Sequence, residues 1–180
     1  MSIKKIVMVM LLTFIVSGCS PPASVNEPVV NETESPQEPV PFQTETNTNQ
    51  VKIILACDRQ QVHAGEKLPL FVKFIIRPGW EIQSLSAPPP MIATKIELEL
   101  PDGFALESEW QEPQATLSAS PDGHSVYAGT ATFEGVVLIE EGRAAADVEI
   151  KADITFQACD EKKCLPPETV SMVLPVRVGE

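Results

Sequence analysis

The sequence predicts an all-β fold, an antiparallel β-sandwich, and three observations lead to this class. Residues 96–100 alternate strictly between apolar and polar side chains, and residues 147–157 do the same over a longer stretch. A period of two is typical of half-buried antiparallel strands. Turn signals separate the apolar stretches, and no stretch has the periodicity of a helix of ordinary length. About seven short strands at this spacing favour a sandwich of the immunoglobulin type.

The first element along the chain is a secretory signal peptide over residues 1–18. Two lysines precede an apolar stretch at residues 6–16, and small residues follow it. A helix needs ~20 apolar residues to cross ~30 Å of hydrocarbon, so this shorter stretch is a processing signal. The segment Val16-Ser17-Gly18-Cys19 resembles the lipobox of bacterial lipoproteins.

The lipobox resemblance implies cleavage before Cys19, with a diacylglycerol on its sulfur and a further acyl chain, such as palmitate, on its freed amine. Two or three acyl chains hold a protein durably on a lipid bilayer. We therefore expect a lipoprotein of the cell envelope whose folded part faces the periplasm. Ser20 stands where inner-membrane lipoproteins carry Asp, so the outer membrane is favoured over the inner one.

Residues 19–50 are expected to form a disordered linker behind the lipidated cysteine. From residue 20 to residue 50 the chain holds five Glu, no Lys or Arg, and many Pro, Asn, Thr and Ser. This composition buries too little apolar area to offset the entropy of an ordered chain. The linker lifts a single domain, residues 51–180, away from the membrane.

The strands predicted within this domain share apolar alternation, or a short apolar run between turn signals. They cover residues 51–56, 68–76, 96–100, 131–139, 146–158 and 168–178. The turns between them include Arg77-Pro78-Gly79, Pro101-Asp102-Gly103 and Pro121-Asp122-Gly123.

The net negative charge of the chain argues against some classes of binding partner. There are 13 Lys and Arg against 25 Asp and Glu, a formal net charge of −12, and the one basic pair within residues 51–180 is Lys162-Lys163. A nucleic-acid partner is therefore not expected, and the acidity serves solubility. The sequence shows neither a nucleophile-base-acid set nor a cluster of metal ligands, so we expect no hydrolase, no metal and no cofactor.

Cys159 and Cys164 bracket a four-residue loop between the last two predicted strands. A hairpin loop of this length brings its flanking residues opposite one another, at a Cα separation that a disulfide tolerates. Export places the pair in an oxidising compartment, so we expect a Cys159–Cys164 disulfide. Cys57 has no evident partner and is expected to be a small buried core residue.

The spacing alone leaves the role of this disulfide open. A staple that closes so short a loop removes little chain entropy, and a bond at an exposed tip is easy for another thiolate to reach. Thiol–disulfide exchange and a structural staple are thus both compatible with the pair. A zinc site is the least favoured interpretation of the pair, because zinc needs four ligands and neither His63 nor His124 lies near the cysteines in sequence.

A family resemblance favours exchange. The run from Ile154 to Thr169, with a double proline directly after Cys164, resembles the active-site hairpin of the N-terminal periplasmic domain of the thiol:disulfide interchange protein DsbD. Upstream, Pro78-Gly79-Trp80, residues 92–104 and Trp110 are similar to the same domain in order and spacing. The resemblance covers roughly residues 50–178 and implies an immunoglobulin-like fold.

The resemblance also implies roles for individual residues. Cys164 matches the cysteine that forms the mixed disulfide with partners, and Cys159 the one that resolves it. Residues 125–129, with Val126 and Tyr127, fall where a small cap loop would shield the pair, although Tyr127 also suits an ordinary strand-edge aromatic. The implied partners are thioredoxin-like or membrane redox proteins of the envelope.

The sequence departs from that family in three ways, and one of them is a loop between the cysteines that is shorter than in the best-studied members. Glu81-Ile82-Gln83 stands where relatives often carry a His and a Tyr, and neither a transmembrane electron conduit nor a thioredoxin-like domain follows Glu180. We expect a thiol–disulfide oxidoreductase module that receives its electrons from a separate protein. The alternative is a binding or scaffold lipoprotein with the same fold and a structural disulfide.

Overall fold

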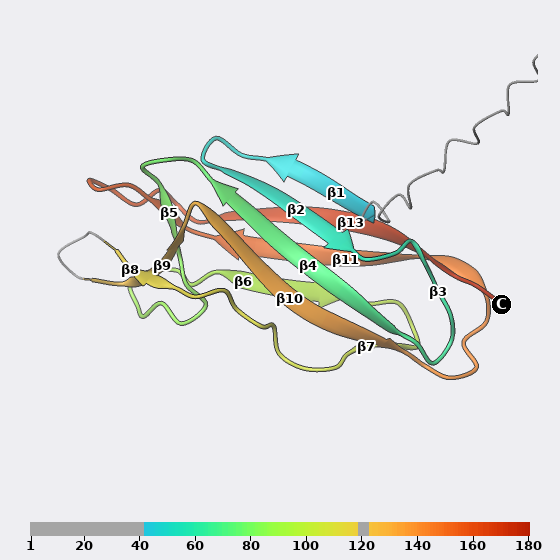
Figure 1. Ribbon diagram of the computed structural model, residues 1–180. Coiled ribbons are helices and arrows are strands. Elements are labelled where there is room, and N and C mark those ends of the chain that lie inside the picture. The colour runs from blue at the N-terminus through green and yellow to red at the C-terminus, as the bar shows by residue number, and fades with distance from the viewer. Residues whose placement is uncertain (1–41, 119–122) are drawn as a thin grey trace, which may run out of the picture. The chain divides into compact units, whose positions relative to one another are not determined.

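The computed structural model describes residues 42–118 and 123–180, and the regular structure in these ranges is entirely β-strand (Figure 1). In chain order the strands are β1 (Phe42–Asn47), β2 (Val51–Cys57), β3 (Gln61–Val62), β4 (Lys67–Ile76), β5 (Glu81–Gln83), β6 (Lys95–Glu99), β7 (Phe104–Leu106), β8 (Thr116–Leu117), β9 (Ser125–Ala128), β10 (Thr130–Ile139), β11 (Ala146–Phe156), β12 (Ala158–Cys159) and β13 (Glu168–Val178). Within the same ranges, no helix has the length and apolar character needed to cross a membrane.

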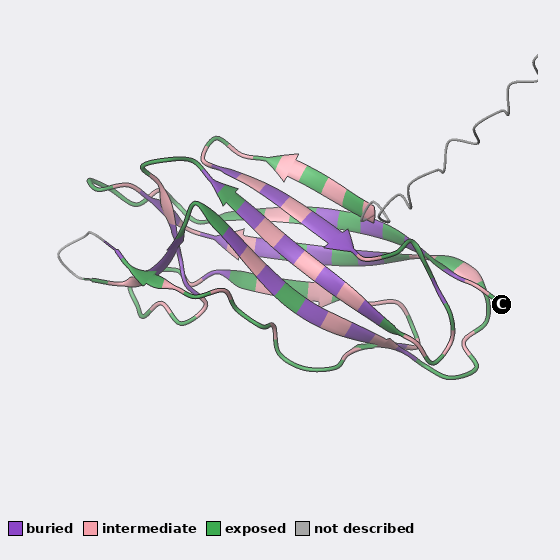
Figure 2. Ribbon diagram, in the orientation of Figure 1, coloured by how far each residue is buried: buried purple, intermediate pink, exposed green. Residues whose placement is uncertain are grey.

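Two main sheets pack face to face, with strand orders β1-β2-β4-β10-β7 and β3-β13-β11-β6. Buried and more exposed positions alternate along β4 and β10, as Figure 2 shows, because successive side chains of a strand point to opposite faces. The rings of Phe74 in β4 and Phe156 in β11 have centroids 6.1 Å apart, so the two inner faces meet in one core. The prediction of an all-β, immunoglobulin-like sandwich is confirmed, with one parallel pair, β3 and β13.

A third, smaller sheet with the order β12-β5-β9-β8 lies at one end of the sandwich. Strand β12 continues the chain just beyond β11, so this small sheet takes up the tip of the β11–β13 hairpin. Figure 1 shows β5, β8, β9 and the hairpin tip at the same end of the molecule. The strands of the small sheet therefore place the side chains that surround the hairpin loop.

The folded part begins earlier than the sequence predicted. The sequence predicts that residues 42–50 belong to the disordered linker, but Phe42–Asn47 forms β1, which pairs antiparallel with β2 and places Phe42 opposite Cys57. Each residue of β1 is half-buried or exposed, so its apolar signal in the sequence is weak. The signal peptide, the lipidation site Cys19 and the linker up to residue 41 lie outside the described residues.

Candidate functional site

The β11–β13 hairpin aligns the two cysteines. The strands pair continuously from Ala146 opposite Val178 to Phe156 opposite Glu168, and an isolated bridge beyond them sets Cys159 opposite Cys164. The Cα atoms of the two cysteines are 4.0 Å apart and their sulfurs are bonded at 2.07 Å. The predicted Cys159–Cys164 disulfide is confirmed, because the register of the hairpin leaves the two residues directly opposite each other.

A tight turn holds the loop between the cysteines. The backbone N–H of Asp160 donates to the carbonyl of Lys163 at 2.9 Å, and the N–H of Leu165 donates to the carbonyl of Ala158 at 2.8 Å. The Asp160 carboxylate accepts the N–H groups of Lys162 at 2.8 Å and Lys163 at 2.9 Å. These two bonds favour the charged form and lower the pKa of Asp160.

Replacement of Asp160 by alanine is expected to loosen this turn. The backbone N–H groups of Lys162 and Lys163 lose their acceptor, so their amide hydrogen exchange should become several-fold faster. Because the pKa of Asp160 is lowered in the folded chain, its contribution is complete above the ordinary carboxyl pKa and is lost as the pH falls through the lowered value. Exchange measured residue by residue checks this, and equal rates in both proteins at neutral pH would contradict it.

The two sulfurs differ sharply in exposure. Cys159 is 3% exposed, whereas Cys164 is an exposed residue at the tip of the hairpin. The side-chain amide of Gln83 donates to Cys159 Sγ, with Nε2 at 3.3 Å. On the other side, Met91 Sδ lies 3.9 Å from Cys164 Sγ. An approaching thiolate can therefore reach Cys164 far more readily than Cys159.

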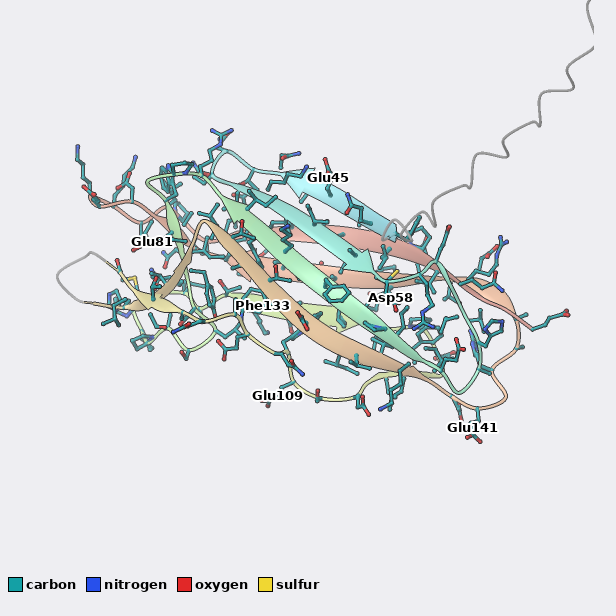
Figure 3. The ribbon with its side chains drawn as sticks, in the orientation of Figure 1. Glu45, Asp58, Glu81, Glu109, Phe133 and Glu141 are labelled. Atoms are coloured by element: carbon teal, nitrogen blue, oxygen red, sulfur yellow. A yellow bond between two sulfur atoms is a disulfide. The ribbon has the colours of Figure 1, made fainter. Side chains whose placement is uncertain are left out.

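A pocket of about 300 Å³ opens beside the disulfide. Strand β5 contributes Glu81, which pairs directly with Cys159 in the sheet and is labelled in Figure 3. The Ser118 hydroxyl donates a short hydrogen bond to the Glu81 carboxylate. The lining residues come from β5, the loop before β6, the β8–β9 region and the hairpin: Glu81, Gln83, Met91, Ser118, His124, Cys159, Asp160, Glu161, Lys162, Lys163 and Cys164.

The loop that carries Met91 is tied to the hairpin. The side chain of Gln157 accepts the Ile92 N–H at 2.9 Å through Oε1, and its Nε2 donates to the Leu165 carbonyl at 3.1 Å. The Met91 N–H donates to the Pro88 carbonyl at 3.0 Å, which closes a turn in the proline-rich loop. Gln157 thus links the segment after Cys164 to the loop that places the Met91 thioether beside it.

Truncation of Met91 to alanine is expected to make the exposed Cys164 sulfur still more accessible. The rate at which glutathione reduces the disulfide should rise several-fold, because the thioether lies against the accessible sulfur. Ile92→Ala is the matched control, since Ile92 is the next residue and is 41% exposed. Stopped-flow or quenched alkylation kinetics check this; an unchanged rate for Met91→Ala, or an equal rise for Ile92→Ala, would contradict it.

The structure does not bring the expected cap residues Val126 and Tyr127 over the disulfide. Both lie in β9 and are buried, and neither lines the pocket beside the cysteines. The Tyr127 ring packs edge-on against Phe133 at a centroid distance of 5.2 Å, and its hydroxyl donates to Glu112 at 2.6 Å. Burial, followed by this hydrogen bond, raises the pKa of Tyr127. Tyr127 is a core residue in this conformation, and Met91 is the side chain that contacts the exposed Cys164 sulfur.

The third cysteine of the described chain stands apart from the pair. Cys57 is fully buried at the end of β2, and its thiol donates to the Arg59 carbonyl at 2.9 Å. Burial is the main reason that the pKa of Cys57 rises to about 11. Its surroundings agree with the core role expected from the sequence. Among the described residues, no group of three or more His, Cys, Asp and Glu is placed to hold a metal ion.

Comparison with solved structures identifies the fold. The N-terminal periplasmic domain of ScsB from Proteus mirabilis superposes with a TM-score of 0.56 at 13% identity, over 75% of this chain and 51% of that chain. The chain has the fold of the ScsB N-terminal periplasmic domain. It spans about half the length of that ScsB chain. The fold implied by the sequence resemblance is thus confirmed.

Two further solved structures superpose with lower TM-scores than the ScsB domain. The N-terminal domain of DsbD from Neisseria meningitidis, in the reduced form, has a TM-score of 0.40 at 15% identity, over 61% of this chain and 82% of that chain. The GAE domain of GGA2p from Saccharomyces cerevisiae has a TM-score of 0.44 at 14% identity, over 74% and 97%. No protein-family model and no curated protein matches the sequence.

Sequence reasoning missed Gln83 and Met91. Gln83 belongs to a strand of only three residues, and Met91 follows three prolines in a loop, so neither position carries a periodic signal. One signal was available for Gln83, because Glu81-Ile82-Gln83 departs from the pattern of the family that the sequence resembles. A departure of that kind beside a cysteine hairpin marks a position worth testing.

Proposed function

We propose that the chain is a thiol–disulfide exchange module of the cell envelope that passes electrons between redox proteins through Cys164 and Cys159. The observation that carries the proposal is the asymmetry of the disulfide, with Cys164 exposed at a hairpin tip and Cys159 buried beneath it. Exchange needs one sulfur open to attack and the other able to leave. A structural staple does not require this difference in exposure between the two sulfurs.

The chemistry follows from this geometry. A thiolate of a reduced dithiol partner attacks Cys164 Sγ, the Cys159–Cys164 bond breaks, and its electron pair leaves on Cys159 Sγ, which takes up a proton. The partner's second thiolate then attacks the partner's own sulfur in the mixed disulfide and releases Cys164 as a thiolate, which is protonated in turn. Two electrons and two protons pass to the chain, and the partner becomes a disulfide. The reverse sequence reduces an oxidised partner.

The partners we propose are thioredoxin-like or membrane redox proteins that face the periplasm. The likeness to a periplasmic domain of ScsB supports this location, and the lipobox at Cys19 supports attachment to a membrane, for which the outer membrane is the proposed one. On this proposal the linker between Cys19 and Phe42 acts as the tether that gives the domain its reach.

A direct exchange assay tests the proposal. The oxidised full chain is mixed with reduced thioredoxin or with glutathione at equal thiol concentration, and the Cys159–Cys164 thiols are counted by alkylation and mass. We expect thioredoxin to reduce the disulfide much faster than glutathione, because a protein partner can bury the exposed tip as it reacts. Reduction no faster by thioredoxin than by glutathione would favour a scaffold lipoprotein with a structural disulfide.

A further inference from the structure

Gln83 is a buried residue whose side-chain amide has a hydrogen-bond partner for its nitrogen but none for its oxygen. The residue is 1% exposed, and its Nε2 donates to Cys159 Sγ at 3.3 Å. Its Oε1 is one of two buried side-chain polar atoms among the described residues that have no hydrogen-bond partner. Buried polar groups are nearly always paired, so an unpaired acceptor beside a reactive sulfur calls for an explanation.

The backbone holds Gln83 in place beside the sulfur. Its N–H donates to the Gln157 carbonyl at 3.2 Å, and its carbonyl accepts the Thr94 hydroxyl. The neighbouring residues of β5, Glu81 and Ile82, pair with Cys159 and Ala158 of β12. The small sheet thus fixes the amide against Cys159 Sγ and gives it little freedom to seek another partner.

The two ends of the amide interact differently with the oxidised and the reduced pair. A disulfide sulfur carries no hydrogen and is a weak acceptor, so it pairs with Nε2–H poorly and with Oε1 not at all. A thiolate is a much stronger acceptor for the N–H, since charge-assisted hydrogen bonds are about twice as strong as neutral ones. A thiol supplies an S–H that can donate to the unpaired Oε1.

We propose that Gln83 shifts the redox equilibrium of the Cys159–Cys164 pair toward the dithiol, by pairing with Cys159 more strongly after reduction than before it. The inference rests on the exchange function proposed above and names the residue that tunes it. When an external dithiol reduces the pair, the electron pair of the broken S–S bond remains on Cys159 Sγ as a thiolate beside Nε2–H. Protonation of that thiolate then provides the S–H for Oε1, and the external dithiol ends as a disulfide.

The test compares the full chain with its Gln83→Met variant, which keeps the length of the side chain and removes the amide. Each protein is equilibrated with glutathione buffers of graded composition, and the fraction of reduced pair is measured by alkylation and mass. We expect the equilibrium constant for reduction to fall about tenfold in Gln83→Met, which corresponds to a potential lower by about 30 mV.

Two further variants separate this role from simple packing. Ile82→Val is the control for packing, because Ile82 is the fully buried neighbour of Gln83 in β5, pairs with Ala158 and does not line the pocket beside the disulfide. Its constant should stay within about twofold of wild type, a change well below the tenfold effect expected for loss of the Gln83 amide. Gln83→Glu replaces the donor by a carboxylate oxygen and should lower the constant at least as much as Gln83→Met.

Unchanged constants in both Gln83 variants, or an equal fall in Ile82→Val, would overturn the inference. These outcomes are distinct from failure of the proposed function. A wild-type chain that exchanges no faster with thioredoxin than with glutathione would count against the function, whereas the difference between wild type and Gln83→Met would still report on the amide.

Discussion

Replacement of Cys164 by alanine is expected to abolish thiol–disulfide exchange, whereas replacement of Cys159 by alanine should leave a chain that captures its partner. The reason is the difference in exposure of the two sulfurs, since Cys164 lies open at the hairpin tip and Cys159 is 3% exposed. In Cys159→Ala the remaining thiol at residue 164 can attack a partner disulfide, but no neighbouring thiol is left to resolve the product. The mixed disulfide should therefore accumulate.

The measurement is non-reducing electrophoresis after each variant has been mixed with an oxidised thioredoxin-like protein and quenched by alkylation. We expect a strong adduct with Cys159→Ala and a yield at background level with Cys164→Ala. Cys57→Ala serves as the control, because Cys57 is fully buried and its pKa is raised to about 11, so it should contribute no adduct. Equal adducts from the two single variants would show that burial does not set the order of attack.

Truncation of Phe74 to alanine is expected to cost about 3–5 kcal/mol of the free energy of unfolding, the usual loss for a large aromatic side chain in a core. Phe74 is fully buried in the middle of the sandwich. Its ring meets Phe133 of the same sheet at 5.5 Å and Phe156 of the facing sheet at 6.1 Å, both edge-on. The substitution therefore opens a cavity where the two sheets are joined.

Phe71→Ala is the matched control for this loss. Phe71 lies three positions earlier on β4, with its side chain on the opposite, half-buried face of the sheet. Urea unfolding of the oxidised proteins gives both free energies. We expect Phe71→Ala to lose less than half as much as Phe74→Ala. Similar losses at the two positions would mean that the sandwich interior does not dominate stability.

The long strands could be predicted from the sequence because each shows the full period of a half-buried strand. Predicted residues 68–76, 131–139 and 168–178 agree with β4, β10 and β13 to within one residue at each end. Strand β1 could not be predicted, because it covers the edge of a sheet with half-buried and exposed positions only. The formation of strand β1 depends on its pairing with β2, which is a tertiary contact.

The candidate site was predictable only where it is local in sequence. Cys159 and Cys164 are five residues apart, so hairpin geometry was enough to pair them. Gln83 and Met91 reach the same place through strands of two to four residues and a loop, which have no usable periodicity. The prediction that Tyr127 belongs to a cap came from its place in the sequence, which could not show that its ring packs against Phe133 in this conformation.

The most direct test of the central claim is the reduction potential of the Cys159–Cys164 pair in the full chain, measured against glutathione or dithiothreitol buffers with alkylation as the readout. A working exchange module should have a potential between roughly −180 and −270 mV, the range of thiol–disulfide oxidoreductases. We expect the pair to fall in this range. A value below about −300 mV, where structural disulfides lie, would contradict exchange and leave the disulfide as a staple of the hairpin.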